Sequence, residues 1–102
     1  MQTNSNTNQR ASFARFSLGQ TYITPGAEEA LMIAGQTGIE YLRRHMCGDW
    51  SELSDEDARE NELSLREGFR VLSAYRTAKG QKLWIITEAD RSATTVLLPS
   101  EY

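Results

Sequence analysis

The chain has 102 residues, of which 39% are hydrophobic, and a formal net charge of -3. This length is typical of one domain whose core needs no metal or disulfide, and the mild negative charge argues against a broad nucleic-acid surface. The single Cys47 excludes an intrachain disulfide, and the absence of any run of about 18 apolar residues excludes a membrane-spanning helix.

The first residues are polar. Residues 1–12 are mostly Asn, Thr, Gln and Ser, a composition typical of a disordered tail, and residues 13–102 are predicted to form a single domain. Residues 1–10 lack the apolar stretch of a signal peptide, so we expect a cytoplasmic protein. Residues 16–24 are predicted to form a strand, in which Gly19 weakens the pattern or marks a bulge.

Two short helices are expected next. Thr24 and Pro25 are the residue types preferred at an N-cap and at the first helical position, and Gly35 is a typical end for that helix. The sequence from Thr37 to Glu40 has the pattern of a capping box and opens the second helix. The apolar spacing predicts that the second helix buries Ile39, Leu42 and Met46.

A third helix is predicted to open at Ser54 and to end at Gly68. Its inner face is thin, with Ala58, Leu63 and Leu65 as its apolar residues. A helix this polar is typical of a surface position, where its caps and its docking onto the rest of the protein supply most of its stability.

Residues 69–77, 81–88 and 94–99 alternate apolar and polar side chains, and turn residues separate them. We therefore expect an α+β fold, with an N-terminal strand and three short helices packed on a C-terminal antiparallel sheet of three to four strands. Such a small sheet has exposed edges, which favours a homodimer. The predicted core consists of Leu31, Ile39, Leu42, Val71, Leu83, Ile85 and Val96.

A polar loop and its flanks hold the densest set of functional groups in the sequence: Thr87, Glu88, Asp90, Arg91, Ser92, Thr94 and Thr95. Carboxylates, a guanidinium and hydroxyls at a strand edge can bind an anion or transfer a proton. The simpler interpretation is a turn, in which Asp90 and Ser92 bond to nearby backbone and Arg91 pairs with Glu88 or Asp90.

His45 is the one histidine of the chain. It is either a general acid or base, or a residue that favours the C-terminal end of a helix through the helix dipole. Its spacing to Cys47 and Asp49 does not match a structural zinc site, so we expect neither a metal nor another cofactor.

Four aromatic residues raise the question of base stacking: Trp50, Tyr75, Trp84 and Tyr102. Aromatic residues on strands are more often part of a core, and the motif of an RNA-recognition sheet is absent. Nucleic acid is therefore a possible but less favoured partner.

The segments 45–50, 72–84 and 83–102, the last reading LWIITEADRSATTVLLPSEY, resemble a family of small bacterial proteins of plasmids, integrative elements and prophages. Its members are recorded as plasmid-related proteins or as type I restriction subunits. The resemblance implies an accessory protein of a mobile element, while a methyltransferase subunit needs a cofactor fold far larger than this chain. The leading hypothesis is therefore a non-enzymatic module that either interacts with or inhibits an unidentified protein.

A second resemblance is one of architecture only. Helices that carry a histidine, followed by an antiparallel sheet, look like ribonucleases of the barnase and RelE types. This analogy implies His45 or Glu88 as base or acid, Arg70 or Arg91 as phosphate ligand, and assistance from Thr95. Across both readings, the candidate ligand-binding residues are Arg70, Tyr75, Asp90 and Thr94.

Overall fold

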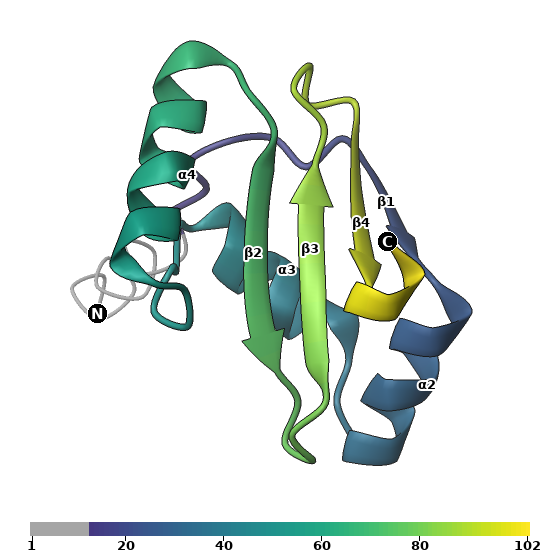
Figure 1. Ribbon diagram of the computed structural model, residues 1–102. Helices are drawn as coiled ribbons and strands as arrows, with labels where there is room; N and C mark the ends of the chain where they lie inside the picture. Colours follow the sequence, from purple (N-terminus) through teal and green to yellow (C-terminus); the bar gives the residue numbers. More distant parts are fainter. Residues whose placement is uncertain (1–12) are drawn as a thin grey trace, which may run out of the picture.

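The computed structural model describes residues 13–102, so the tail predicted at residues 1–12 lies outside the described residues. Over these residues the fold is α+β, as predicted, with three α-helices and a short 3-10 helix around one sheet of four strands (Figure 1). None of these helices has the length and apolar character needed to cross a bilayer. The elements are β1 (Gln20–Ile23), α2 (Pro25–Ala34), α3 (Gly38–Met46), α4 (Asp55–Glu67), β2 (Val71–Arg76), β3 (Lys82–Thr87), β4 (Ala93–Leu97) and η1 (Pro99–Glu101).

The sheet has the strand order β1-β4-β3-β2. β2, β3 and β4 form the antiparallel meander that the sequence predicts, with Ile86 between Leu72 and Thr95. β1 pairs with β4 in parallel, so the sheet is mixed rather than fully antiparallel. Gly19 precedes β1 with φ 64, and a Cβ atom there would collide with the carbonyl oxygen of Ser92. Only glycine therefore lets the chain enter β1 this close to β4.

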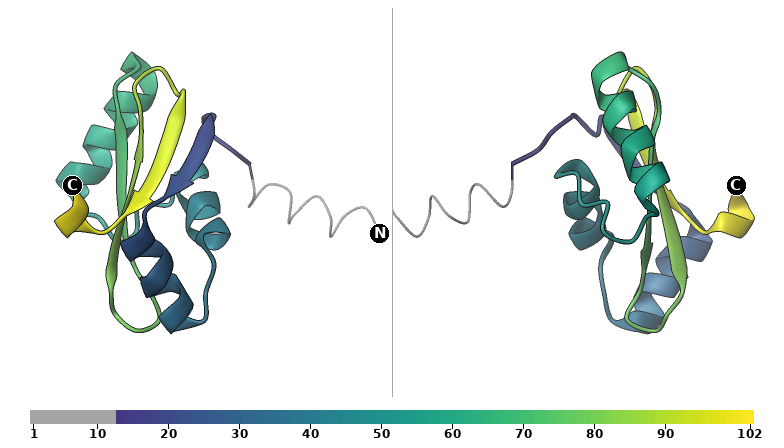
Figure 2. Two further views of the ribbon diagram at one scale, coloured as in Figure 1. Left: turned by 90° about the vertical axis from the view of Figure 1, so that its right-hand side faces the viewer. Right: turned by 60° about the vertical axis from the view of Figure 1, so that its left-hand side comes forward.

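Helices α2 and α3 cover one face of the sheet, which we call the covered face (Figure 2). Thr24 caps α2 as predicted, because its side chain accepts a hydrogen bond from the Ala27 N–H, and Gly35 ends the helix in the left-handed conformation. The core under the two helices contains Ala27, Leu31, Tyr41, Tyr75, Leu83, Ile85 and Val96, with Leu42 packed against it.

The prediction of which α3 residues are buried was wrong for Ile39, which is 61% exposed. Tyr41 and His45 face the sheet instead, four residues apart on one stripe of the helix. The predicted capping box is also absent, because the Thr37 side chain makes no cap hydrogen bond and Glu40 accepts from Gln36. Because His45 is polar, the spacing of apolar residues in α3 did not indicate that its side of the helix faces the sheet.

Helix α4 lies beside the edge strand β2 (Figure 1). Ser54 caps it as predicted, by accepting a hydrogen bond from the Asp57 N–H. The predicted inner residue Leu63 is exposed, whereas Asn61 and Ser64 are buried. The helix thus docks by polar groups, because the edge of a strand offers backbone N–H and C=O groups rather than apolar side chains.

No α-helix of residues 13–102 covers the other face of the sheet, and η1 lies on that side (Figure 2). We call this the open face. Strand alternation and register assign to it Tyr22, Leu72, Ala74, Arg76, Lys82, Trp84, Ile86, Thr95 and Leu97.

Candidate functional site

His45 lies at the centre of a buried chain of hydrogen bonds. Its Nδ1 contacts the Ser73 hydroxyl, and its Nε2 lies 2.8 Å from the Thr87 hydroxyl. The Thr87 hydroxyl is 2.7 Å from that of Thr94, which donates to the Leu18 carbonyl oxygen at 2.7 Å. These contacts connect α3, the three antiparallel strands and the segment before β1.

Counting protons along this chain of hydrogen bonds shows which ring nitrogen of His45 is protonated. Each hydroxyl has one proton, and that of Thr94 goes to the Leu18 carbonyl, which cannot donate. Thr87 must then donate to Thr94, so the His45 Nε2 carries a proton and donates to Thr87. The Ser73 hydroxyl in turn donates to an unprotonated Nδ1. The network is complete with a neutral imidazole.

Burial keeps this imidazole neutral. His45 has no exposed surface, and the rings of Phe16 and Trp50 meet it edge-on, with centroids 5.1 Å and 6.2 Å away. Desolvation, with a smaller effect of the Arg91 charge, lowers the pKa of His45 to about 3. A ring with both nitrogens engaged and no access to solvent is poorly placed to exchange protons with a substrate.

The polar loop has the geometry of a turn. The Asp90 side chain accepts a hydrogen bond from the Ser92 N–H at 3.0 Å. Arg91 adopts a positive φ of 61 and donates to the carbonyl oxygens of Phe69, Glu88, Ala89 and Ser64. The simpler interpretation therefore describes the loop better, except that Arg91 bonds to backbone carbonyls rather than to a carboxylate.

These contacts predict an order of stability at position 91. Arg91→Ala loses four hydrogen bonds to carbonyls, and this loss is expected to lower the free energy of unfolding by about 2 kcal/mol. Like wild type, Arg91→Ala keeps a residue with a Cβ atom in the left-handed region. Arg91→Gly loses the same bonds but relieves the backbone, so it should be about 1 kcal/mol more stable than Arg91→Ala. Urea denaturation measures the order; equal stability of Arg91→Ala and wild type would contradict it.

The remaining predicted site residues do not meet at one place. Thr94 belongs to the buried chain, whereas Thr95 points to the open face, since neighbouring strand residues point to opposite sides. Glu88 is exposed at the end of β3. Tyr75 is buried, its hydroxyl donates to the Asp49 carbonyl oxygen at 2.8 Å, and burial raises its pKa to about 12.

Arg70 is part of a different cluster, on the open face. Its guanidinium donates to the Tyr102 hydroxyl at 2.8 Å and lies 5.7 Å from the centre of the Tyr102 ring. That ring meets Trp84 edge-on, with centroids 5.6 Å apart. Arg70 and Tyr102 are exposed, and Trp84 is half-buried. We call these three residues the open-face cluster.

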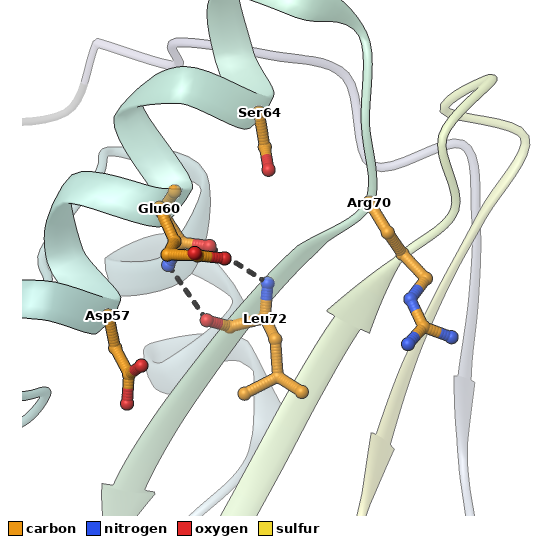
Figure 3. Close-up of a pocket in the computed structure, with 6 residues that line it drawn as sticks. Asp57, Glu60, Ser64, Arg70 and Leu72 are labelled. Carbon is orange, nitrogen blue, oxygen red and sulfur yellow. Dashed lines mark hydrogen bonds between the residues drawn. The ribbon is translucent and has the colours of Figure 1, made fainter.

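A hollow of about 340 Å³ lies between α4 and β2, beside the open-face cluster (Figure 3). The Asn61 side chain is part of its lining, with its Nδ2 donating to the Leu72 carbonyl oxygen at 2.7 Å and its Oδ1 accepting from the Leu72 N–H at 3.2 Å. Arg70 points away from the acidic side chains of Asp57 and Glu60, over the sheet (Figure 3). Sequence reasoning missed Asn61, for which the only signal was a polar residue on a thin inner helix face.

Within residues 13–102, no three His, Cys, Asp or Glu side chains gather in a way that could hold a metal ion. Comparison of the chain with protein-family models, with curated proteins and with solved structures gave no match.

Proposed function

We propose that this protein is a non-enzymatic accessory module of a mobile genetic element, which acts in the cytoplasm by binding and inhibiting another protein. The observation that carries the proposal is the open-face cluster. Tryptophan, tyrosine and arginine are the residue types most enriched among those that dominate binding energy at protein interfaces. Here one of each lies on a face that no α-helix of residues 13–102 covers, and Tyr102 contacts both Arg70 and Trp84.

The placement of the reactive groups also supports a binding function. His45 and Thr94 are hydrogen-bonded within the buried chain, and the Arg91 guanidinium donates to carbonyl oxygens. These side chains are therefore already engaged inside the protein. The ribonuclease-like alternative requires these groups, together with Glu88, to converge on an open concave site. A binding module requires no such convergence.

The charges of the open face favour an acidic partner surface. Its charged strand positions are Arg76 and Lys82, and Arg70 adds a third cation. The Glu52 carboxylate lies beside Arg76 and Lys82 but already accepts hydrogen bonds from Arg44 and from the Arg76 N–H. Complementary charge of this kind steers association and selects partners. The acidic side chains of Asp57 and Glu60 lie next to this face and repel the continuous row of phosphates of a nucleic acid, whereas a protein can place separate carboxylates over the cations alone.

Quantitative affinity capture from cells that carry the mobile element tests the proposal. Arg70→Ala and Tyr102→Ala should each reduce recovery of the partner roughly tenfold, because residues of this type carry a large share of binding energy. Arg43→Ala removes another exposed arginine, on α3, and serves as the matched control. Equal recovery by all three variants would contradict the proposal.

The alternatives are separated by two assays on the purified protein. RNA cleavage by wild type that is lost in Glu88→Ala would establish the ribonuclease-like function instead; Glu88 is exposed, so this variant leaves the core intact. Binding of single-stranded RNA or DNA that depends on Trp84 and Tyr102 would establish a nucleic-acid partner.

A further inference from the structure

The two edges of the sheet differ in how their backbone groups are satisfied. At the β2 edge, the Asn61 amide pairs with both backbone groups of Leu72, and the Glu52 carboxylate accepts from the Arg76 N–H at 3.0 Å. Helix α4 lies along the same edge (Figure 1). Pairing of a further strand with β2 is thereby obstructed.

The β1 edge has no such cover among the described residues. The Gln20 N–H donates to Ser92 and the Thr24 N–H donates to Val96, both on the β4 side at 3.0 Å. In a parallel ladder the residues between them, Thr21 and Ile23, direct their backbone groups to the other side. No hydrogen bond from the described part of the chain reaches those groups. All four β1 residues are exposed, and none is charged.

Apolar side chains are exposed around this edge. Tyr22 is 55% exposed, and further exposed residues come from β1, from α2 and from the first turn of α3: Ile23, Met32, Ile33 and Ile39. Helix α2 lies below β1 when this edge faces the viewer (Figure 2). A concentration of exposed apolar residues beside a bare strand edge indicates an interaction surface.

We propose that β1 pairs in antiparallel fashion with β1 of a second copy of this chain, about a two-fold axis at Tyr22. In this register Tyr22 faces Tyr22 of the second copy, and Thr21 faces Ile23 of the second copy. The outward N–H and C=O groups of Thr21 and Ile23 then form reciprocal hydrogen bonds. The two tyrosine side chains lie side by side on the open face, and the two sheets become one.

A second copy suits this edge because the edge is self-complementary. A two-fold axis brings each outward donor to an acceptor of the same strand in the other copy, and a strand without charges meets itself without repulsion. This inference goes beyond the proposed function, since it uses none of the open-face cluster. The dimer presents two such clusters on the same side of one sheet, which strengthens binding to any partner with repeated acidic sites.

Sedimentation equilibrium of the full chain tests the dimer. Wild type should show a concentration-dependent increase to twice the mass of one chain. Tyr22→Lys places two ammonium groups face to face at the axis and should weaken dimerisation roughly tenfold or more. Gln20→Lys makes a similar change on the same strand and face but lies opposite Thr24 of the second copy, so its dimer should resemble that of wild type.

Crosslinking tests the register without relying on the lysine variants. In a Cys47→Ala background, Tyr22→Cys should form an interchain disulfide under mild oxidation, because Cα atoms of such a pair lie about 4.5 Å apart. Gln20→Cys should not, since its two copies are about 14 Å apart along the strands.

Three results would overturn the dimer: a wild type that is monomeric at every concentration, equal effects of the two lysine variants, or crosslinking through Gln20→Cys but not Tyr22→Cys. A monomer means that β1 is covered by residues 1–12 or left for another protein. A monomer whose Arg70→Ala variant still loses the acidic partner overturns the dimer alone and leaves the proposed function standing.

Discussion

Lowering the pH from 6.5 to about 4.5 is expected to reduce the free energy of unfolding by about 2 kcal/mol through His45 alone. The folded protein holds the pKa of His45 at about 3, whereas the unfolded chain has the ordinary value of 6.5. Between these two values the unfolded state binds more protons than the folded state. The stabilisation is therefore complete above pH 6.5 and is lost as the pH falls towards 3, by about 1.4 kcal/mol for each pH unit.

The pH window identifies the group responsible. Bonds from Arg15 and Trp50 lower the pKa of Glu62 to about 2 from 4.5, so that carboxylate also loses stabilisation in acid, but only below its ordinary pKa. Any slope between pH 6.5 and about 5 therefore reports His45. Urea denaturation across this range should show the slope in wild type and lose it in His45→Gln, which keeps a polar side chain without a titratable group. The same slope in His45→Gln would contradict the assignment.

Asn61→Ala is expected to lower the free energy of unfolding by about 3 kcal/mol. Asn61 is 4% exposed, and its amide makes two hydrogen bonds to the backbone of Leu72. Truncation leaves the part-buried N–H and C=O of Leu72 without protein partners and loosens α4 from the sheet. Glu60→Ala, an exposed change one residue away, is the matched control and should alter stability by less than about 0.5 kcal/mol.

A nearly isosteric variant separates lost hydrogen bonds from lost volume. Asn61→Asp keeps the shape but replaces the donor to the Leu72 carbonyl with a carboxylate oxygen that repels it. It should be at least as destabilising as Asn61→Ala. If Asn61→Asp had the stability of wild type, the pairing with Leu72 would not hold α4 in place.

The antiparallel strands and the helix boundaries were predictable, because their signals are local. Alternation within residues 69–77 and 81–88 depends only on neighbouring residues, as do the cap at Thr24 and the left-handed glycine at Gly35. The parallel pairing of β1 was not predictable in this way, since it joins segments far apart in the chain.

The buried hydrogen bonds of His45 were not predictable for a related reason. From the sequence, His45 could be catalytic or structural, and the outcome depends on contacts with Ser73 and Thr87, which come from two other elements. The spacing of apolar residues likewise favoured Ile39 over Tyr41 on α3, because a histidine on the inner stripe breaks the apolar pattern. The open-face cluster joins Arg70, Trp84 and Tyr102 only once the sheet has formed.

The central claim is that the one histidine is a buried structural residue, so that function lies on the surface. Because His45 is the one histidine in the sequence, its ring gives one unambiguous set of NMR signals. Titration of these signals in the folded protein tests the claim directly. They should stay at the positions of a neutral ring, with the proton on Nε2, from about pH 8 down to about pH 5, since the pKa is about 3. A titration midpoint near 6.5 in the folded state would contradict the claim and return His45 to the list of catalytic candidates.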